Sequence, residues 1–378
     1  MRVVFIGEWF HGEGNDSHLR ALAESVDLTI YGTGDPPEFS AFRELRPVRL
    51  SPGVGPRFWF YRDLDRGLDA DRPDVVHVLT EPWQLLALQT SRWARRSPGT
   101  AFVMHNSDRN WWTVPAGKRL ARRIVARQTF ARADGFVSES SGGVREAEQF
   151  GLTNGTVTAA VIMNPRDPDA FRPPVDGAER KAARERLGLP REGTGVGYLG
   201  RLSEEKGPIL FVDAFEHAAA RAEQPLWAGV AGTGPQEGEV AARTAGTSIN
   251  CLGSLDYPDQ VATFLHAVDV LVMPSVRIGV WEEQAPRAVV EAMLSGCIVV
   301  GTPVGGIPEM LDGTGIVVDE STPSSLADGI LRAATDEAAS ELPGAARTRA
   351  IDVYSGRSAA RSLVDVWERA LLARGKHT

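Results

Sequence analysis

The sequence predicts an α/β protein made of two doubly wound domains, each a parallel sheet with helices on both faces. Three observations lead to this prediction. The chain has 378 residues, more than a single hydrophobic core usually serves. Short apolar runs alternate with longer amphipathic ones, which is typical of βα units around parallel sheets. A stretch dense in Pro, Asp and Arg, 164–177, separates two such series and is interpreted as a linker.

The first series predicts an N-terminal Rossmann-like domain over residues 1–165. Helices are expected between its strands, notably at 82–96 and 117–133. The predicted strands are the apolar runs 1–7, 26–32, 74–80, 100–106, 135–140 and 157–164.

The second series predicts a C-terminal Rossmann-like domain over residues 166–355. Residues 356–378 are expected to form a last helix that packs back on the N-terminal domain. The predicted strands are 194–200, 226–232, 249–254, 269–275, 297–303 and 315–319, and the predicted helices are 208–222, 258–268, 286–296 and 321–336.

Composition and charge narrow the class of protein. The net charge of −8 gives no reason to expect a nucleic-acid partner. The first apolar run is too short for a signal peptide, and no stretch approaches about 18 apolar residues, so we expect a cytoplasmic protein. Cys251 and Cys297, the two cysteines, both lie in apolar runs and are interpreted as reduced core thiols.

Two cations follow the first strand of the second series. In GRLSEEKG, Arg201 and Lys206 flank a flexible turn, and two neighbouring cations suit a diphosphate. Taken alone, ordinary surface charge explains them better. Glycines follow two other strands, Gly232 in AGTGPQ and the pair Gly305 and Gly306 in GTPVGGIPEM. Each set by itself is ordinary turn chemistry, but all of them fall at one edge of one sheet.

The stretch WEEQAPRAVVEAMLSG, 281–296, predicts a helix with an uncapped start. Pro286 suits the first helical position, whereas Ala285 before it is not a capping residue. Bare N–H groups and the positive end of the helix dipole attract an anion. A diphosphate is therefore the ligand that the cations, the glycines and this helix start have in common.

The ordered segments resemble a known family. GRLSEEKG, AGTGP, CLGSL, DVLVMPS, EEQAPRAVVEAMLSG and GTPVGGIPE resemble the C-terminal domain of retaining glycosyltransferases of family 4, which have the GT-B fold of two Rossmann-like domains facing across a cleft. The first half agrees less closely, through DRPDVVHV, AFVMHN, ADGFVSES and MNPRDPDAFRP. The resemblance implies transfer of a sugar from a nucleotide-diphosphate donor to an acceptor hydroxyl, with retention of anomeric configuration.

The resemblance also implies roles for individual residues. Glu283 and Glu291 match the family's E-x7-E motif, so Glu283 would hold donor-sugar hydroxyls and Glu291 the nucleotide ribose, while Arg201 and Lys206 would bind the diphosphate. The expected catalytic residues are His105, Glu283, Arg201 and Lys206. The expected donor-binding residues are Gly12, Gly200, Arg201, Lys206, Gly232, Leu252, Glu283, Ala285, Pro286, Arg287 and Glu291.

His105 ends the strand AFVMHN and matches a histidine that the family places near the donor sugar, on the opposite side of the cleft. A core or surface histidine is the alternative. The chain departs from the family at two places. Asn106 stands where an Asp often follows the histidine, and Ala285, Pro286 and Arg287 stand where Phe-Gly-Leu is common.

Aromatic side chains that follow strands of the first domain are candidates for the acceptor site: Trp9, His11, Trp111 and Trp112. Core or interface packing explains such aromatics equally well. The basic helix 117–133 favours a solvated outer face, with peripheral membrane contact as the alternative. Two Asp-x-Asp sequences, at 63–65 and 69–71, lie in a predicted amphipathic helix and not after a strand, so we expect surface carboxylates and no catalytic metal.

The sequence therefore predicts a metal-independent hexosyltransferase with a small-molecule, glycan or lipid-linked acceptor. UDP-sugars lead the candidate donors and GDP-mannose follows. The resemblance implies same-face attack, in which the leaving phosphate takes the acceptor proton, with Glu283 as a covalent nucleophile being the alternative. A nucleotide-sugar epimerase and a non-catalytic sugar-nucleotide-binding protein are the competing functions.

Overall fold

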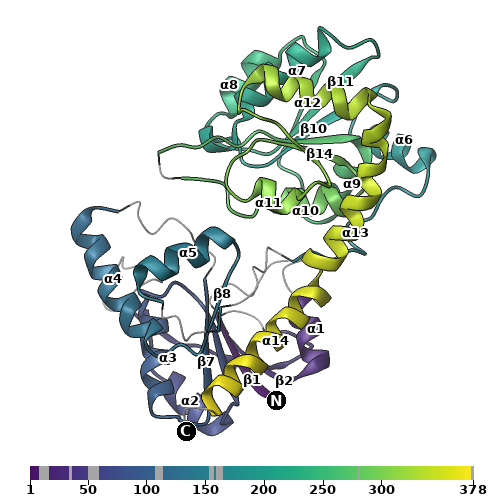
Figure 1. Cartoon of the computed structure of the whole chain (residues 1–378). Helices are drawn as coiled ribbons and strands as arrows, with labels where there is room; N and C mark the ends of the chain where they lie inside the picture. Colours follow the sequence, from purple (N-terminus) through teal and green to yellow (C-terminus); the bar gives the residue numbers. More distant parts are fainter. Residues whose placement is uncertain are drawn as a thin grey trace. The chain divides into compact units, whose positions relative to one another are not determined.

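The structure is a computed structural model that describes residues 1–7, 17–33, 36–49, 59–106, 114–152, 157–158, 165–279 and 281–375. The chain divides into two compact units (Figure 1). The N-terminal unit comprises Met1–Pro165 with Gly356–Thr378, and the C-terminal unit comprises Arg166–Ser355.

The N-terminal unit is built on a parallel sheet of seven strands in the order β3-β2-β1-β6-β7-β8-β9. A short antiparallel pair, β4 with β5, stands apart from it. The strands are β1 (Arg2–Gly7), β2 (Asp27–Gly32), β3 (Ala41–Glu44), β4 (Pro47–Arg49), β5 (Trp59–Tyr61), β6 (Val75–Leu79), β7 (Ala101–Asn106), β8 (Gly135–Ser138) and β9 (Val157–Thr158).

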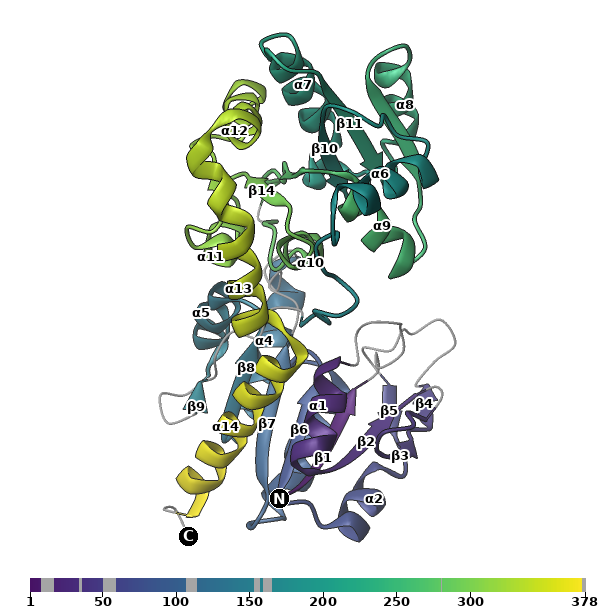
Figure 2. The same cartoon turned by 90° about the vertical axis from the view of Figure 1, so that its right-hand side faces the viewer.

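Both faces of this sheet are covered, because successive side chains of a strand point to opposite faces. On β1, Val4 and Ile6 pack on one face with side chains of α2, α3, α4 and α5, whereas Val3 and Phe5 pack on the other with α1 and α14. Figure 2 shows α1 and α14 beside β1 and β6. The helices are α1 (Ser17–Ser25), α2 (Leu64–Asp71), α3 (Leu85–Arg95), α4 (Ala116–Phe130), α5 (Ser141–Phe150) and α14 (Gly356–Gly375).

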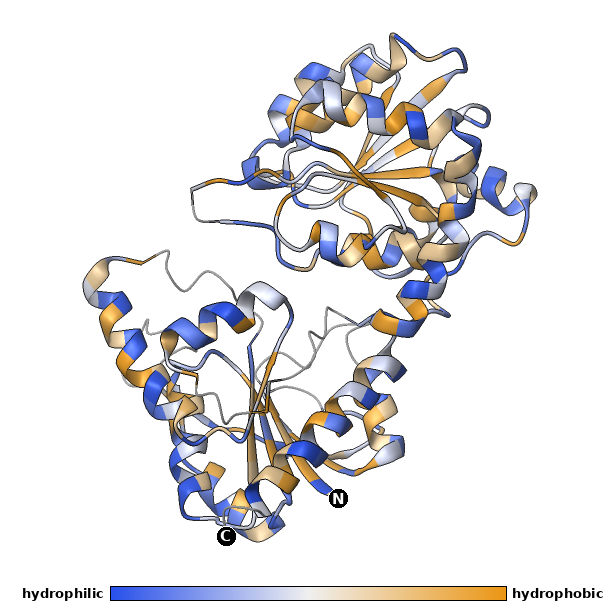
Figure 3. Cartoon of the chain, in the orientation of Figure 1, coloured by the Kyte–Doolittle hydropathy of each residue, from blue (hydrophilic) through white to orange (hydrophobic). Residues whose placement is uncertain are grey.

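The C-terminal unit has a parallel sheet of six strands in the order β12-β11-β10-β13-β14-β15. Counted along the chain this is 3-2-1-4-5-6, the strand order of the Rossmann fold. The strands are strongly hydrophobic (Figure 3), as expected where both faces are buried. They are β10 (Thr194–Leu199), β11 (Leu226–Ala231), β12 (Ile249–Gly253), β13 (Val270–Met273), β14 (Ile298–Gly301) and β15 (Ile316–Val317).

Helices flank this sheet on both faces (Figure 1). One core joins Val196 and Tyr198 of the central strand to Phe211 and Phe215 of α7 and to Leu326 of α12. The helices are α6 (Gly177–Arg186), α7 (Pro208–Ala219), α8 (Glu237–Thr244), α9 (Asp259–Ala267), α10 (Arg287–Leu294), α11 (Ile307–Leu311), α12 (Pro323–Thr335) and α13 (Leu342–Tyr354), with the short 3₁₀ helices η2 (Glu204–Lys206) and η3 (Glu337–Glu341).

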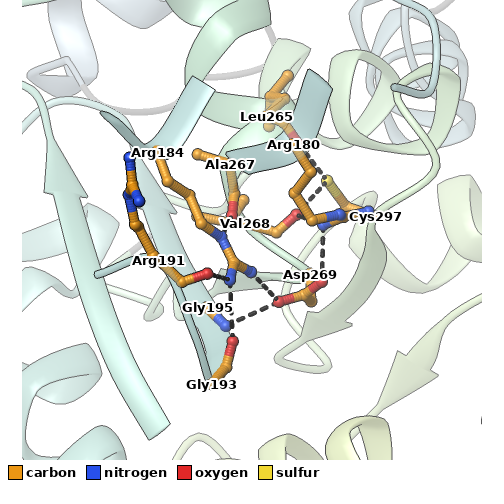
Figure 4. A network of polar contacts seen from close by, with 10 residues as sticks. All are labelled: Arg180, Arg184, Arg191, Gly193, Gly195, Leu265, Ala267, Val268, Asp269 and Cys297. Atoms are coloured by element: carbon orange, nitrogen blue, oxygen red, sulfur yellow. Dashed lines mark hydrogen bonds and ion pairs between the residues drawn. The ribbon is translucent and has the colours of Figure 1, made fainter. Parts of the chain in front are cut away.

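A polar network attaches α6 to the amino end of the central strands (Figure 4). Asp269, just before β13, accepts hydrogen bonds from Arg180 at 2.6 Å, from Arg184 at 2.9 Å and from the backbone N–H of Gly195 at 2.8 Å. Arg184 also donates to the backbone carbonyls of Arg191, Gly193 and Ala267. These groups lie at the edge opposite the strand ends that the sequence marks as the site.

The predicted fold class is confirmed, and each predicted strand has a counterpart; of the run 157–164, the structure describes the first two residues. The strands β3, β4 and β5 and the helices α6, α8, α11 and α13 were not predicted. The prediction for Cys251 is wrong: its side chain is exposed on β12, whereas Cys297 is buried. Among the described residues, no helix is long and apolar enough to cross a membrane.

Candidate active site

The strand order of the C-terminal unit reverses between the neighbours β10 and β13. After β10 the chain turns one way to β11, and after β13 it turns the other way to β14. Open α/β sheets bind ligands at such a switch point, beyond the carboxyl ends of the strands. Two loops leave this point. The first, 200–207, carries Arg201 and Lys206, and the second, described over 274–279 and 281–286, carries Glu283.

Glu283 is the centre of the contacts between these loops. Its Oε2 accepts a hydrogen bond from Lys206 Nζ at 2.6 Å and another from Ser275 Oγ at 2.9 Å. Only 5% of Glu283 is exposed, whereas Lys206 is half-buried and lies over the ring of Trp281. The structure thus brings together two residues that the sequence predicted for neighbouring parts of one ligand.

Backbone contacts hold the two loops in register. The N–H of Val276 in the second loop donates to the carbonyl of Glu205 in the first. Ser203 Oγ donates to the Glu205 carboxylate at 2.6 Å. Burial would raise the pKa of Glu205, but this hydrogen bond helps to lower it. Gly207 has φ +65°, and a Cβ there would lie 2.1 Å from the carbonyl oxygen of Pro274. A residue with a side chain would force the two loops apart.

Arg201 is exposed at the start of the first loop and forms no ion pair with a residue that the structure describes. Its backbone carbonyl accepts a hydrogen bond from the Tyr198 hydroxyl at 2.7 Å, so the backbone is fixed while the guanidinium reaches solvent. Of the two predicted diphosphate cations, Lys206 is therefore already engaged by Glu283, and Arg201 is available.

The glycines of the neighbouring loops let one backbone segment approach another closely. A Cβ on Gly305 would lie 1.7 Å from the carbonyl oxygen of Glu283, and one on Gly306 would lie 1.9 Å from that of Gln284. Gly232, with φ +141°, approaches the carbonyl of Gly200 in the same way, at 1.8 Å. These glycines permit close packing of one loop on another, which fixes the backbone around Glu283.

Helix α10 begins one residue later than predicted. Pro286 is its N-cap, with ψ 119°, and the Pro286 carbonyl accepts from the N–H of Val289 at 3.1 Å. No side chain caps this end, which agrees with the uncapped start read from the sequence. Ala285 is buried and Arg287 is exposed at the first helical position. Leu252 is half-buried near the end of β12.

Glu291 lies on the buried side of α10, with 4% of the residue exposed. Its Oε1 accepts from Arg166 Nε at 3.1 Å, and it shares a hydrogen bond with the Tyr257 hydroxyl. Burial raises the pKa of Glu291, although the charges of Arg166 and Arg287 oppose this shift. Arg166 itself is 1% exposed, so one residue of the predicted linker is part of the core.

In the N-terminal unit, His105 lies near the carboxyl end of β7, and its Nδ1 is 3.1 Å from Nε2 of His77 on β6. Burial, followed by the charge of His18, lowers the pKa of His105 to about 3. His105 is therefore a neutral hydrogen-bonding group near pH 7. Sequence reasoning missed His77, because a single histidine inside an apolar run gives no functional signal.

The predicted acceptor residues Trp9, His11, Trp111 and Trp112, together with Gly12, lie outside the described residues. The Asp-x-Asp carboxylates lie on or just before α2. Asp63 and Asp69 are exposed and Asp65 and Asp71 are half-buried, and three of the four hydrogen-bond to neighbouring side chains. Their partners are Arg96 for Asp65, Trp93 for Asp69, and Tyr31 with Arg43 for Asp71.

Two family models of glycosyltransferases match parts of the chain. Residues 193–336 match the family model described as glycosyl transferases group 1, and residues 16–169 match that of glycosyltransferase family 4. The D-inositol 3-phosphate glycosyltransferase of Streptomyces avermitilis is 30% identical over 377 residues, which cover 87% of this chain and 77% of that protein. The chain belongs to the family 4 glycosyltransferases.

A second relative and solved structures are also similar to this chain. The Corynebacterium kroppenstedtii protein of the same name is 29% identical over 269 residues, 68% of this chain and 58% of that protein, so less than two thirds of its length is matched. Among solved structures, Anabaena HepE in complex with UDP has a TM-score of 0.75 at 16% identity, with 97% of this chain and 100% of that chain covered.

A sucrose-phosphate synthase from Thermosynechococcus elongatus has a TM-score of 0.69 at 18% identity, with 99% and 100% covered. At this level of identity the two structures show the fold, which for this glycosyltransferase is GT-B. The roles of its individual site residues remain predictions.

Proposed function

We propose that this glycosyltransferase moves a sugar from a UDP-sugar to an acceptor hydroxyl with retention of configuration and without a metal. The observation that carries the proposal is the contact of Lys206 with Glu283 at the switch point of the C-terminal sheet, beside the uncapped start of α10. Anabaena HepE was solved with UDP and with UDP-glucose, which supports uridine as the base.

Lys206 suits a role at the diphosphate. An ammonium group has three N–H donors, so Lys206 keeps its hydrogen bond to Glu283 while it donates to a phosphate oxygen. Arg201 and the open N–H groups of α10 add positive charge at the same edge. Departure of UDP places negative charge on the β-phosphate, and preorganised donors stabilise charge that develops in the transition state.

Glu283 suits a role at the donor sugar. Oε2 is occupied by Lys206 and Ser275, whereas Oε1 accepts only the long contact of 3.3 Å from the N–H of Gln284 among the described residues. A carboxylate oxygen with open lone pairs accepts hydrogen bonds from sugar hydroxyls. In our proposal the acceptor attacks the face that UDP leaves, and the departing phosphate takes the proton.

The test measures UDP release from UDP-glucose with candidate acceptors, beginning with inositol 3-phosphate, which appears in the relatives' name. We expect release only when the acceptor is present, a product that keeps the donor's anomeric configuration by NMR, and a rate that EDTA leaves unchanged. Conversion of the donor sugar without acceptor would show an epimerase. Binding without turnover would show a non-catalytic protein, and loss of activity in EDTA would overturn metal independence.

Two neighbouring acids provide a matched pair of variants. Glu283→Gln is expected to lower kcat by at least about a hundredfold, because it weakens the hydrogen bonds to both the sugar and Lys206. Glu282→Gln is the control, since Glu282 pairs with Arg277 and stands outside these contacts. Equal rates for the two variants would contradict the role of Glu283.

A further inference from the structure

Three aromatic rings form a hydrogen-bonded chain inside the N-terminal unit. Trp367 of α14 places its Nε1 3.0 Å from Nδ1 of His77 on β6. His77 places its Nε2 3.1 Å from Nδ1 of His105 on β7. Trp367 and His77 are fully buried, and Phe5 stacks on His77 at 4.3 Å between ring centroids, so this chain of rings has little freedom to rearrange.

The indole of Trp367 sets the direction of both hydrogen bonds in this chain of rings. The indole Nε1–H only donates, so Nδ1 of His77 accepts and carries no proton. A neutral His77 then carries its proton on Nε2 and donates it to Nδ1 of His105. Nδ1 of His105 is therefore also an acceptor, and a neutral His105 must carry its proton on Nε2.

Both histidines meet the condition of neutrality. Burial lowers the pKa of His105 to about 3 and that of His77 well below its ordinary value, and each is further lowered by the charge of His18. Protonation of either ring would also place two N–H donors face to face or opposite the indole. One arrangement of protons is left for the whole chain of rings.

At His105, the end of this chain of rings away from Trp367, the Nε2–H is a hydrogen-bond donor. Nε2 of His105 is buried and hydrogen-bonds to no residue that the structure describes, while 6% of the residue is exposed. A buried N–H without an acceptor is unfavourable, because it has lost its hydrogen bond to water. His105 lies near the carboxyl end of β7, the edge of a parallel sheet at which ligands bind. A substrate oxygen at this edge would accept the bond.

We propose that His77 and Trp367 are positioning residues that fix His105 in its Nε2–H tautomer, so that His105 presents a neutral N–H donor to an oxygen of the bound substrate. The contact with substrate rests on the proposed function. The choice of tautomer does not, because it follows from the three rings alone. The helix α14 thereby acts on His105 through the core of the N-terminal unit.

Long-range ¹H–¹⁵N NMR correlations of the full chain near pH 7 test the tautomer directly. We expect His105 with Nε2 protonated and Nδ1 unprotonated. In Trp367→Phe the indole donor is lost while an aromatic ring remains, so either tautomer leaves one atom of His77 without a partner, and a substantial Nδ1–H population should appear at His105. Trp93→Phe removes the indole donor to Asp69 in the same unit and should leave His105 unchanged.

Two results would overturn the inference. One is an Nδ1–H tautomer of His105 in the unaltered protein. The other is the same population of His105 tautomers in Trp367→Phe and Trp93→Phe. Assays of sugar transfer distinguish a failure of this inference from a failure of the proposed function. If sugar transfer is observed, Trp367→Phe should lower kcat/KM about tenfold, the equivalent of one hydrogen bond, and Trp93→Phe should not. The expected tautomers without any sugar transfer would leave the inference on positioning standing and refute the proposed function.

Discussion

Glu291 shows what a single residue of the motif contributes to the fold. It is a carboxylate almost removed from water, and it is held by Arg166 at 3.1 Å and by the Tyr257 hydroxyl. The motif spacing identified Glu291, but Arg166 stands in a stretch whose Pro, Asp and Arg content is typical of a linker. Burial of an arginine depends on the partner that the fold brings to it, so local composition carried no signal for this pair.

Removal of Arg166 should leave a buried carboxylate without the cation that hydrogen-bonds to it. Arg166→Ala is therefore expected to lower the free energy of unfolding by roughly 3–5 kcal/mol, measured by chemical denaturation. Arg172→Ala is the matched control from the same stretch, because Arg172 and Glu179 form a much more exposed pair. Such pairs contribute roughly 0–1 kcal/mol. Equal losses in the two variants would contradict the structural role of Arg166.

At the scale of elements, the strands were predictable and several helices were not. The buried strands, such as β6 and β13, are apolar runs bounded by polar residues, and that pattern survives in any parallel sheet. Helix α6 reads GAERKAARER, which is too polar to show an apolar stripe. It is held instead by the ion pairs of Arg180 and Arg184 with Asp269, which join residues more than 80 positions apart.

In the loops of the candidate site, too, local sequence predicts one feature but misses contacts between residues that are distant in the sequence. Their glycines were predicted as points of ligand approach, and the structure adds that Gly305 is required by the close approach of the Glu283 carbonyl. A sequence marks where backbone must come close, but it does not say whether the neighbour is a ligand or another loop. The position of Glu283 therefore depends on packing between loops that are distant in the chain.

Two glycine variants separate this packing from backbone strain. Gly305→Ala adds a methyl group against the Glu283 carbonyl at a φ of +62°, and should lower both thermal stability and affinity for UDP. Gly313→Ala has a comparable φ of +80° with nothing within 4 Å of the added Cβ, and should show only the strain of about 1–2 kcal/mol. Melting curves and UDP titrations of both variants test this. UDP affinity that is equally affected in the two would show that loop packing does not position Glu283.

At the scale of the whole molecule, the stability of the N-terminal unit should depend on pH through its buried histidines. Burial lowers the pKa of both His77 and His105, whereas an unfolded histidine titrates near 6.5. The unfolded chain therefore binds more protons than the folded unit below pH 6.5. Stability that is fully present above pH 6.5 is lost as the pH falls toward 3.

We expect the free energy of unfolding of this unit to fall by up to about 1.4 kcal/mol per pH unit for each histidine below pH 6.5. Denaturation between pH 7.5 and 5.5 covers a range in which most carboxylates stay ionised. His105→Gln should reduce the slope by about half a proton at pH 6.5 and by nearly one proton at pH 5.5. A stability that is constant or rises as the pH falls over this range would contradict the burial of neutral histidines.

We propose above all that the C-terminal unit binds the diphosphate of a nucleotide sugar through Arg201 and Lys206. Calorimetric titration of the full chain with UDP and with UMP tests it most directly, because the two ligands differ by one phosphate. We predict that UDP binds at least about tenfold more tightly than UMP, and that Lys206→Ala and Arg201→Ala each reduce this difference. Equal affinity of the unaltered protein for UDP and UMP, or no binding of either, would contradict the account.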